Sequence, residues 1–255
     1  MLKGLISIMK LVTLNLWGGI VSKEYKKFFE KYPDIDIWCF QEVYKDVYGP
    51  HQLEDEPNNF RLYDELQKYL PSHKHEFSHF LKDAFGIASF VNKDIKIAEN
   101  GEIMIARGNY EDLSNPERDM NRKAQWLELE VKSKKVLIVN THFTHRPVGK
   151  RDSEKRLRQS KIIVDFLSMF DCPKILVGDF NLLPDTESIN IIERSGMKNL
   201  IKEYGVTSTR TELYTKEWKF ADYIFVSPEI KINDFKVLPD VVSDHSPVYL
   251  DFDIV

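Results

Sequence analysis

The residues best suited to chemistry follow an apolar stretch in the second half of the chain. Lys174–Val177 is predicted to form a buried strand, and a glycine, an acid, a phenylalanine and an amide follow it directly. An acid and an amide at positions i and i+2 of an extended chain point to the same side. We therefore expect Asp179 and Asn181 to lie together at the edge of the core. For this stretch alone, a simple polar turn after the strand is an equal alternative.

The same pattern, an apolar strand next to polar or titratable side chains, recurs at five other places. These are Asn15, Glu42, His142, Asp222, and Asp244 with His245. Each place alone has an ordinary structural explanation, such as a solvated carboxylate at the end of a strand. If the strand ends converge, one site holds four carboxylates, two amides and two imidazoles.

This set of groups suits the hydrolysis of a phosphate ester. Oxygen ligands without thiolates select Mg²⁺ or Mn²⁺ over Zn²⁺. A histidine next to an aspartate suits a base that is oriented by a carboxylate. A metal ion beside such a histidine neutralises the charge that develops on the phosphoryl oxygens and the leaving group, and fixed donors stabilise the rest.

The elements that must position these residues are mostly strands, with a few helices between them. Strands are predicted at 11–17, 35–40, 85–91, 95–97, 102–105, 125–131, 135–142, 174–177, 220–226 and 248–252. Helices are predicted at 21–32, 61–70 and 157–167, and a fourth is predicted to begin at 184–188 with Asp185 as its cap. No fixed repeat and no linker-like tract appears, so we expect one domain over residues 1–255 with its core at about 10–253.

Composition and charge narrow the class of protein. The 255 residues are 42% hydrophobic and 12% aromatic, which indicates a folded globular chain. The net charge of −4 does not indicate a nucleic-acid binder, so such binding needs a local basic patch. Cys39 and Cys172 have neither disulfide nor zinc spacing. No apolar run reaches the roughly 20 residues of a membrane span, and no secretory signal is evident. We expect a cytoplasmic monomer.

Three histidines raise the question of a second metal site. His73, His75 and His79 alternate around Phe77, a spacing that fits the outer face of a strand. Divalent-metal sites usually show tighter ligand sets. The strand face is the favoured interpretation.

Six short motifs follow one another along the chain, at Thr13–Gly18, Gln41–Val43, Asn140–Phe143, Gly178–Asn181, Asp222–Ile224 and Ser243–Pro247. In sequence and in order they resemble the endonuclease/exonuclease/phosphatase superfamily, which contains Mg²⁺-dependent phosphodiesterases and phosphatases similar to deoxyribonuclease I. The resemblance extends from about Lys10 to Phe252. It implies a four-layer α/β sandwich in which two packed mixed β-sheets are flanked by helices.

The resemblance also implies roles for the site residues. Glu42 would be the principal ligand of a Mg²⁺ or Mn²⁺ ion, with Asn15 and Asp244 close to that ion. Asp179 would position or activate the attacking water. Asn181 would donate a hydrogen bond to a phosphate oxygen.

The imidazoles would face the phosphate. His245 is similar to the family's histidine beside the scissile phosphate, held in one tautomer by Asp222, and His142 would serve as an acid or an oxyanion donor. Family members differ in which group is the base, so Asp179 and His245 both remain candidates. Arg210 is a further candidate for contact with the phosphate.

Other residues near the motifs have two interpretations each. Arg156 and Gln159 match an Arg-x-x-Gln of many family members, and we expect them to support the site, although a solvated helix face is an equal alternative. Trp17 and Tyr44 follow two site strands and either stack on a base or pack at the rim.

The predicted function is the hydrolysis of phosphate esters by a Mg²⁺- or Mn²⁺-dependent phosphodiesterase or nuclease, through in-line attack of water. The alternatives are a phosphomonoesterase, a lipid or sugar phosphodiesterase, and, in another class, a non-catalytic binding module. The last predicts a lost metal carboxylate or imidazole, and all of them are present. DNA and RNA are candidate substrates, but the net charge argues against a general double-strand nuclease. Loops 44–60, 107–123 and 205–215 are expected to determine the substrate, with Arg118, Arg122 and Lys123 in the second loop.

Overall fold

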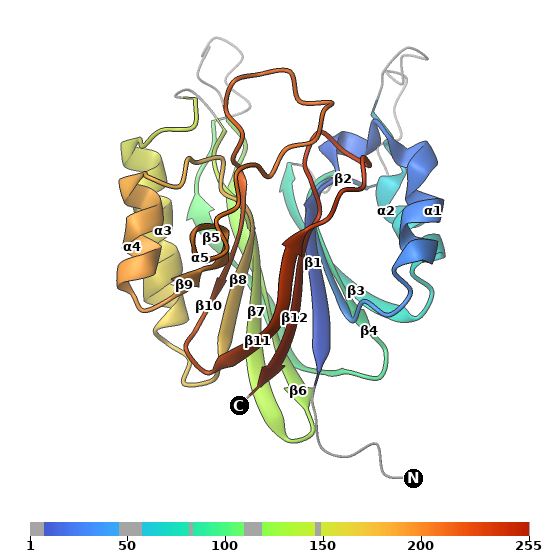
Figure 1. Cartoon of the computed structure of the whole chain (residues 1–255), viewed down its shortest axis with the longest axis horizontal. Coiled ribbons are helices and arrows are strands. Elements are labelled where there is room, and N and C mark those ends of the chain that lie inside the picture. The colour runs from blue at the N-terminus through green and yellow to red at the C-terminus, as the bar shows by residue number, and fades with distance from the viewer. Residues whose placement is uncertain (1–7, 46–57, 82–83, 110–118, 146–148, 255) are drawn as a thin grey trace.

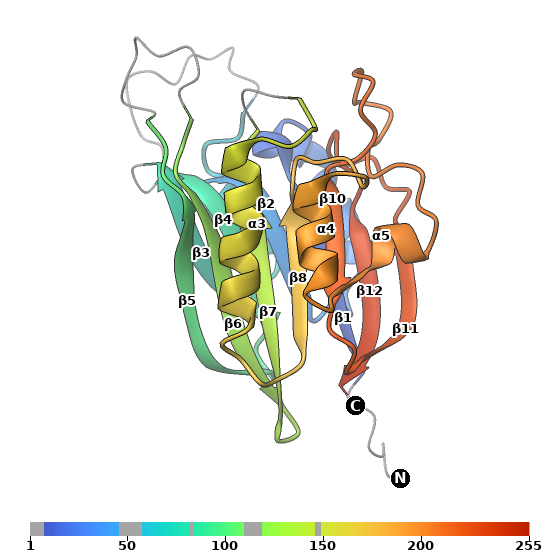
Figure 2. The same ribbon diagram turned by 90° about the vertical axis from the view of Figure 1, so that its left-hand side faces the viewer.

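Two six-stranded β-sheets lie face to face in the computed structural model (Figure 1). Helices cover the outer face of each sheet, so the chain forms four layers, as Figure 2 also shows. The structure describes residues 8–45, 58–81, 84–109, 119–145 and 149–254. The predicted sandwich of two mixed sheets flanked by helices is confirmed.

The first sheet has the strand order β11-β12-β1-β2-β4-β3. Its strands are β1 (Met9–Asn15), β2 (Ile37–Tyr44), β3 (His73–Leu81), β4 (Phe85–Asn92), β11 (Ile230–Val237) and β12 (Val248–Ile254). Only β1 and β2 are parallel neighbours in this sheet. Because they run the same way, Asn15 and Glu42, near their C-terminal ends, come to one edge of the sheet.

The second sheet has the strand order β5-β6-β7-β8-β10-β9. Its strands are β5 (Lys96–Ala106), β6 (Arg122–Val131), β7 (Lys134–His142), β8 (Lys174–Asp179), β9 (Lys198–Asn199) and β10 (Asp222–Val226). β7 and β8 are parallel, and β10 runs antiparallel to β8. The ends of β7 and β8 therefore meet the start of β10 at one edge.

The helices lie on the outer faces of the two sheets. α1 (Tyr25–Lys31) and α2 (Leu62–Tyr69) cover the first sheet, whereas α3 (Glu154–Leu167), α4 (Glu187–Arg194) and α5 (Leu200–Glu203) lie on the side of the second (Figures 1 and 2). None of the helices in the described ranges has the length and apolarity that crossing a membrane requires.

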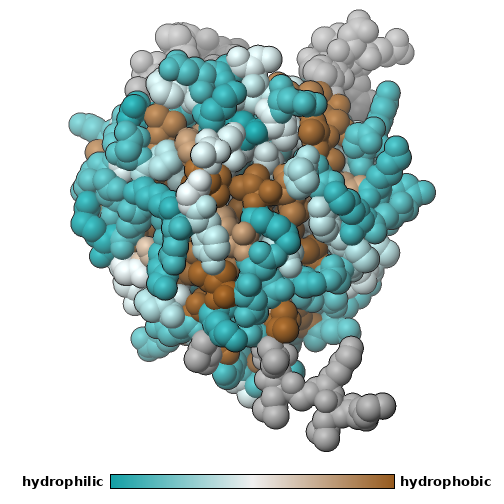
Figure 3. All heavy atoms as spheres, in the orientation of Figure 1, coloured by the Kyte–Doolittle hydropathy of each residue, from teal (hydrophilic) through white to brown (hydrophobic). Residues whose placement is uncertain are grey.

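Apolar side chains fill the space between the layers. Ile175, Leu176 and Val177 of β8 are fully buried, which confirms the predicted strand with two covered faces. On the outer side of the first sheet, the Phe29 ring of α1 packs edge-on against Trp38 of β2, 5.1 Å between ring centroids. In the view of Figure 3, hydrophilic residues cover most of the surface, and hydrophobic residues show mainly in its middle.

A buried polar bridge joins the two sheets just beneath the edge where the motifs meet. The Gln41 amide of β2 donates to Asn140 Oδ1 of β7 at 2.7 Å, and Asn140 Nδ2 donates to the backbone oxygens of Phe40 and Ala88, both at 3.2 Å. Gln41 and Asn140 are both buried. Because buried amides need partners, this bridge fixes how one sheet sits on the other.

The helices α3 and α4, on the outer face of the second sheet, begin close together. Ser153 caps α3 by accepting from the Arg156 amide at 3.3 Å. The cap of α4 differs from the prediction, because Asp152 accepts from the amides of Glu187 and Ser188 at 2.8 and 2.9 Å. Asp185 instead pairs with Arg151 on the surface. A side chain distant in sequence thus replaced the local cap.

Several element boundaries differ from the prediction. Segments 96–97 and 102–105 belong to the single long strand β5, which Ile95 precedes, and β11, the two-residue β9 and the short α5 were missed. β5 and β11 are largely exposed strands rich in charged residues, so their apolar signal is weak. The strand predicted at 125–131 to be half exposed begins at Arg122 and is largely buried.

The three histidines of the strand at 73–81 do not share one environment. His75 and His79 are exposed as expected, but His73 is 5% exposed and its Nε2 lies 2.9 Å from the backbone oxygen of Ile35. Among the described residues, none of the three belongs to a cluster with metal-binding spacing.

Candidate active site

Strand register brings three site residues side by side. His142 pairs with Asp179 across β7 and β8, and Asp222 pairs with Asp179 across β8 and β10. Gly178 permits this close pairing, because a β-carbon there would overlap the Thr141 backbone oxygen. The edge of the second sheet therefore presents an imidazole and two carboxylates from three neighbouring strands.

Asp179 occupies the centre of this group. The side chain is buried, with Oδ1 accepting from the Asn181 amide at 2.7 Å and Oδ2 from Asn15 Nδ2 at 2.9 Å. The Nε2 atoms of His142 and His245 lie 3.6 and 3.7 Å from Oδ2. The two imidazoles thus flank one carboxylate oxygen.

Glu42 approaches from the opposite sheet. Its strand was predicted to end before it, but β2 continues to Tyr44 with a bulge between Gln41 and Val43. Glu42 occupies the bulge with a left-handed φ of 56°. Such strain re-aims a side chain and is concentrated at functional sites. Here it turns the carboxylate toward the second sheet.

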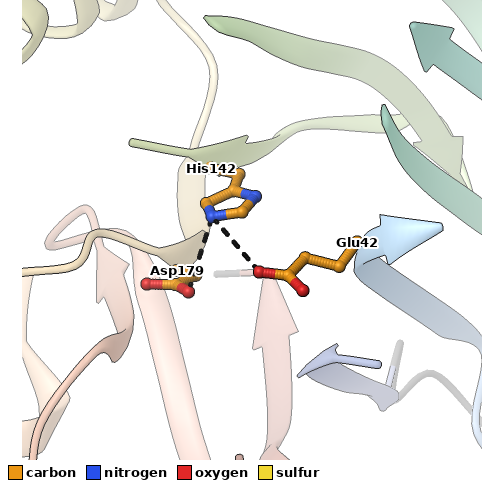
Figure 4. Close-up of side chains that lie close together, drawn as sticks. All are labelled: Glu42, His142 and Asp179. Carbon is orange, nitrogen blue, oxygen red and sulfur yellow. Dashed lines mark ion pairs between the residues drawn. The ribbon is translucent and has the colours of Figure 1, made fainter. Parts of the chain in front are cut away.

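His142 connects the two sheets at this point. Its Nε2 lies 3.9 Å from Glu42 Oε1 and 3.6 Å from Asp179 Oδ2 (Figure 4). Asn15 Nδ2 adds a second connection, because it donates to Glu42 Oε1 at 3.1 Å as well as to Asp179. The ends of β1, β2, β7 and β8 therefore share one site.

His245 and Asp222 form a second pair. His245 Nδ1 lies 2.9 and 2.8 Å from the two carboxylate oxygens of Asp222. A carboxylate there holds the proton on Nδ1 and leaves Nε2 facing the site. An isolated β-bridge between Arg210 and His245 fixes the loop that carries the imidazole. This pairing with Asp222 is the one that the family resemblance implied, whereas the adjacent Asp244 does not contact Nδ1.

Arg210 lies in the site beside Asp244. Its Nη1 donates to Asp244 Oδ2 at 2.8 Å, and its guanidinium stacks on the Tyr214 ring at 4.1 Å. The side chain is only 4% exposed. Within the described ranges, Arg210 Nε and Asp244 Oδ1 are buried without a hydrogen-bond partner. Both groups therefore keep bonding capacity for a ligand.

Asn181 reaches the site by a different route from the one predicted. Its backbone is in the left-handed region with φ 53°, so it does not continue the extended strand. The Asp179 carboxylate accepts a hydrogen bond from the backbone N–H of Asn181, which closes a tight turn. The two side chains lie together because of this turn and not because of the strand pleat.

Sequence reasoning missed two contacts of Asn181. Lys150 Nζ donates to Asn181 Oδ1, and His145 Nδ1 lies 3.2 Å from the same oxygen. Lys150 is 2% exposed although it stands in a strongly charged segment. The only available signal was its place in the connection after the His142 strand, which did not distinguish it from the exposed basic residues nearby.

Arg156 supports the connection that contains Lys150. The guanidinium is fully buried and donates to the backbone oxygens of Thr144 at 3.0 Å and of His145 and Gly149 at 2.8 Å. Burial lowers the pKa of Arg156 to about 10, so the group stays charged at neutral pH. The supporting position predicted for Arg156, rather than a solvated helix face, is the one observed.

Gln159, the other residue of that motif, also faces inward. It is fully buried, and its Oε1 accepts from the Thr144 amide at 3.3 Å. It therefore holds the same connection from the α3 side.

The residues expected to shape specificity are only partly described. Arg118 lies outside the described residues. Arg122 is buried, donates to Asp119 at 3.3 Å and lies over the Phe80 ring, whereas Lys123 pairs with Glu102. Neither basic side chain is a free surface charge.

The aromatic residues near the site also have structural contacts. The Tyr44 ring packs on Phe60 and Phe85, 5.0 and 4.7 Å between centroids, which favours rim packing over stacking on a base. Trp17 has a φ of 49° at the turn after β1, and its amide donates to Asn15 Oδ1 at 2.9 Å.

The two central carboxylates have opposite electrostatic surroundings. Burial raises the pKa of Glu42; His245 and the Asn15 hydrogen bond act against this, and the carboxylates of Asp179 and Asp244 add to it. Burial acts in the same sense on Asp179, but Lys150, His245, His142 and Arg210 outweigh it and hold its pKa below the usual range. Burial lowers the pKa of His142 well below its ordinary value.

The donor set fits a hard divalent cation. Glu42 and Asp244 offer carboxylate oxygens, and one oxygen of Asp244 is buried without a partner in the described ranges. The carboxylates of Asp179 and Asp244 raise the pKa of Glu42 because the negative charges repel one another. A bound cation would offset this repulsion. Asn15 turns its Nδ2 toward Glu42, so it supports that carboxylate rather than offering its oxygen.

Two clusters of titratable groups have metal-binding spacing in the described part of the chain. They are Glu42 with His142 and Asp179, and Asp179 with Asp222 and His245, each with ligand atoms within 4.8 Å of one another. Asp244, predicted near the metal, belongs to neither cluster. Its nearest charged partner is Arg210.

Comparison with known proteins places this site in a family. The model of the endonuclease/exonuclease/phosphatase family matches residues 12–245. The chain belongs to this family and is a phosphoric ester hydrolase with the deoxyribonuclease-I-like fold. No curated protein sequence matches the chain.

Solved structures support the same fold. An endonuclease/exonuclease/phosphatase family protein from Bacteroides thetaiotaomicron is 20% identical, with a TM-score of 0.75 over 99% of this chain and 100% of that chain. A mannosyl-6-phosphatase from the same organism is 19% identical, with a TM-score of 0.72 over 96% and 99%. TDP2 from D. rerio, complexed with a single-strand DNA product, is 14% identical, with a TM-score of 0.72 over 97% and 99%.

Proposed function

We propose that the chain is a Mg²⁺- or Mn²⁺-dependent phosphodiesterase. The observation that carries this proposal is the gathering of Glu42, Asp179 and the Asp222–His245 pair around one space between the two sheets. Glu42 and Asp244 would hold the ion, with Asn15 bracing Glu42. The ion, when bound, would neutralise charge on the phosphoryl oxygens and the leaving oxygen.

The protein's own groups divide the rest of the reaction. The oxygen of a water molecule attacks phosphorus while the bond from phosphorus to the ester oxygen opposite breaks. The water proton passes to Asp179 Oδ2 or His245 Nε2, which lie 3.7 Å apart and so can both reach one water. Asp222 keeps the Nε2 atom of His245 directed at this point.

The phosphate oxygens would be bound by side-chain donors. Asn181 Nδ2 and His142 Nε2 contact each other at 3.3 Å beside Asp179, and each would turn its N–H to a phosphate oxygen that enters between them. Because burial lowers the pKa of His142, its imidazole is neutral. A neutral imidazole suits a hydrogen-bond donor better than a general acid. Arg210, with its unpartnered Nε in the described ranges, would bind a further phosphate oxygen.

For the substrate we propose a nucleic-acid phosphodiester, with single strands preferred. The TDP2 neighbour, complexed with a single-strand DNA product, supports this choice. The mannosyl-6-phosphatase neighbour makes a phosphate monoester the competing substrate class. The net charge of −4 weighs against broad binding of duplex DNA.

For the cellular setting we propose a cytoplasmic monomer. Cys39 and Cys172 are both free, which fits a reducing compartment. Light scattering on the purified protein tests the oligomeric state.

A substrate panel tests the function. Purified protein with Mn²⁺ should hydrolyse bis-p-nitrophenyl phosphate faster than p-nitrophenyl phosphate, and a chelator should abolish the activity. His245→Gln should lower kcat by about 10²–10⁴-fold, the usual contribution of a positioned acid or base. His79→Gln, an exposed histidine of β3, is the matched control and should retain full activity.

The same panel distinguishes the substrate classes. Single-stranded DNA, duplex DNA, RNA and sugar phosphates should be compared at equal concentration. Faster cleavage of the monoester would replace the phosphodiesterase proposal with a phosphatase. If wild type and His245→Gln were equally inert on every substrate, the catalytic proposal would be wrong.

A further inference from the structure

A buried lysine outside all six sequence motifs contacts the proposed phosphate-binding amide. Lys150 lies between β7 and α3, is 2% exposed, and donates through Nζ to Asn181 Oδ1. His145 Nδ1 lies 3.2 Å from the same oxygen. On the other side of the carboxamide, Nδ2 faces His142 Nε2 at 3.3 Å and donates to the Phe143 backbone oxygen at the long distance of 3.4 Å.

The chemistry of the ammonium group determines which way this amide points. An ammonium has three donors and no acceptor, so it pairs only with the oxygen of a carboxamide. With Oδ1 held by Lys150, the NH₂ group of Asn181 is directed at His142 and the space beside Asp179. The reverse orientation would place NH₂ against the ammonium and present an oxygen to an anionic phosphate.

The segment that carries Lys150 is anchored on both sides. Arg156 donates to the backbone oxygens of Gly149 and Arg151, the two neighbours of Lys150. The Lys150 backbone oxygen accepts from the Leu183 amide at 2.8 Å, which ties it to the chain just after Asn181. The contact between Lys150 and Asn181 is therefore held by the backbone and not only by a flexible side chain.

Burial of this charge has a cost that the fold alone does not require. Desolvation lowers the pKa of Lys150 to about 8, although Asp179 acts in the opposite sense. The hydrogen-bond partner is a neutral amide, which compensates a buried charge less than a carboxylate does. Buried charges with such shifted pKa values are concentrated at functional sites.

We propose that Lys150 is a positioning residue of the hydrolytic site, because its ammonium holds the Asn181 carboxamide with NH₂ toward the phosphate. The inference rests on the proposed hydrolase function. Lys150 acts through Asn181, and its removal lets the amide rotate and lose its donor in a fraction of the molecules.

A double-mutant cycle tests this coupling in the full-length protein with saturating Mn²⁺. Asn181→Ala should lower kcat by about 10²–10³-fold, as for loss of one preorganised donor, and Lys150→Met by about 10–10²-fold with little change in KM. In the Asn181→Ala background, Lys150→Met should change kcat by less than about threefold, because its target is gone. Lys150→Arg retains a donor-only cation and should recover part of the activity.

Controls separate this inference from the proposed function and from misfolding. Arg151→Met removes a charge from the next residue, which is exposed and paired with Asp185, and should leave kcat unchanged. Thermal melts should show that Lys150→Met is folded. If wild type hydrolyses phosphodiesters and the effects of Lys150→Met and Asn181→Ala multiply, Lys150 contacts phosphate itself or acts on the fold, and the inference is wrong. If wild type is inert on the whole panel, the proposed function fails instead.

Discussion

The two sheets bring carboxylates of opposite electrostatic character to one site. At the end of the first sheet, Glu42 lies in a strained bulge, and burial, aided by the neighbouring acids, raises its pKa although His245 and Asn15 act against this. At the end of the second sheet, Asp179 accepts two hydrogen bonds, and the cations around it hold its pKa low. Two titratable groups whose surroundings separate their pKa values usually have different roles.

The difference assigns each sheet a share of the chemistry. A carboxylate that other carboxylates repel gains most from a bound cation, so the Glu42 end suits the metal. A carboxylate that stays ionised beside two imidazoles can accept hydrogen bonds from the attacking water at all working pH values, so the Asp179 end suits orienting that water. Asp244, Arg210 and His245, on the loops before β10 and β12, complete the site between them.

The largest expected effects come from substitutions of the two carboxylates, Asp179 and Glu42, which test whether they have different roles. Asp179→Asn should lower kcat by about 10²–10⁴-fold while Mn²⁺ affinity stays within about threefold of wild type, because it removes the carboxylate that orients the attacking water. Glu42→Gln should weaken Mn²⁺ binding by at least about tenfold, and excess Mn²⁺ should restore part of its activity. Calorimetric titration and kinetics against Mn²⁺ concentration measure both.

Asp185→Asn on the protein surface is the control for this pair and should match wild type in both measurements. Equal losses of Mn²⁺ affinity in Asp179→Asn and Glu42→Gln would show that the two carboxylates share one role.

An intermediate effect is expected where the two regions meet. Arg210→Met removes the charge that pairs with Asp244 and stacks on Tyr214, so KM for a phosphodiester should rise by about 10–10²-fold, as for a charged hydrogen bond of about 1.5–3 kcal/mol. Arg210→Lys should recover only part of this, because an ammonium lacks the planar fork. Arg194→Met on α4, an exposed arginine paired with Glu187, should leave KM unchanged. An unchanged KM in Arg210→Met would remove Arg210 from the phosphate site.

The smallest expected effect concerns His73, which lies away from both carboxylates. It tests the stability of the fold independently of the site. Burial lowers the pKa of His73 below its ordinary value of 6.5. Below pH 6.5 the unfolded chain therefore binds a proton that the folded chain does not. As the pH is lowered, the free energy of unfolding decreases by at most about 1.4 kcal/mol per pH unit. Above pH 6.5 this contribution is fully present.

Urea unfolding of wild type and His73→Gln between pH 5 and 8 measures that slope. The variant should lose stability less steeply than wild type below pH 6.5. Parallel curves for wild type and His73→Gln would show that His73 does not cause the acid sensitivity.

Much of the fold was predictable because its central strands are continuous apolar runs. The strands around Ile175 and Trp38 are buried on both faces, so hydrophobicity alone marks them. The exposed edge strands β5 and β11 have mixed composition, and their pairing depends on neighbours far away in the sequence. This is why two predicted segments proved to be one strand and why β11 was missed.

The sequence predicted which residues form the site. It did not predict the backbone conformations that bring them together. Asn15, Glu42, His142, Asp179 and His245 all reach one place, as their positions next to apolar strands suggested. The bulge that aims Glu42 and the left-handed turn that places Asn181 have no clear sequence signal, because tertiary contacts stabilise these strained conformations.

The sequence by itself determined the apolar strands, the order of the six motifs and hence the family and its set of acids, amides and imidazoles. These are properties of local composition and spacing. Only the tertiary structure decided which basic residue, Lys150, is buried against Asn181, that Arg210 pairs with Asp244, and that Asp152 rather than Asp185 caps α4. Each of these depends on contacts between segments distant along the chain, and for a charged side chain such contacts, not residue type, decide between burial and solvent.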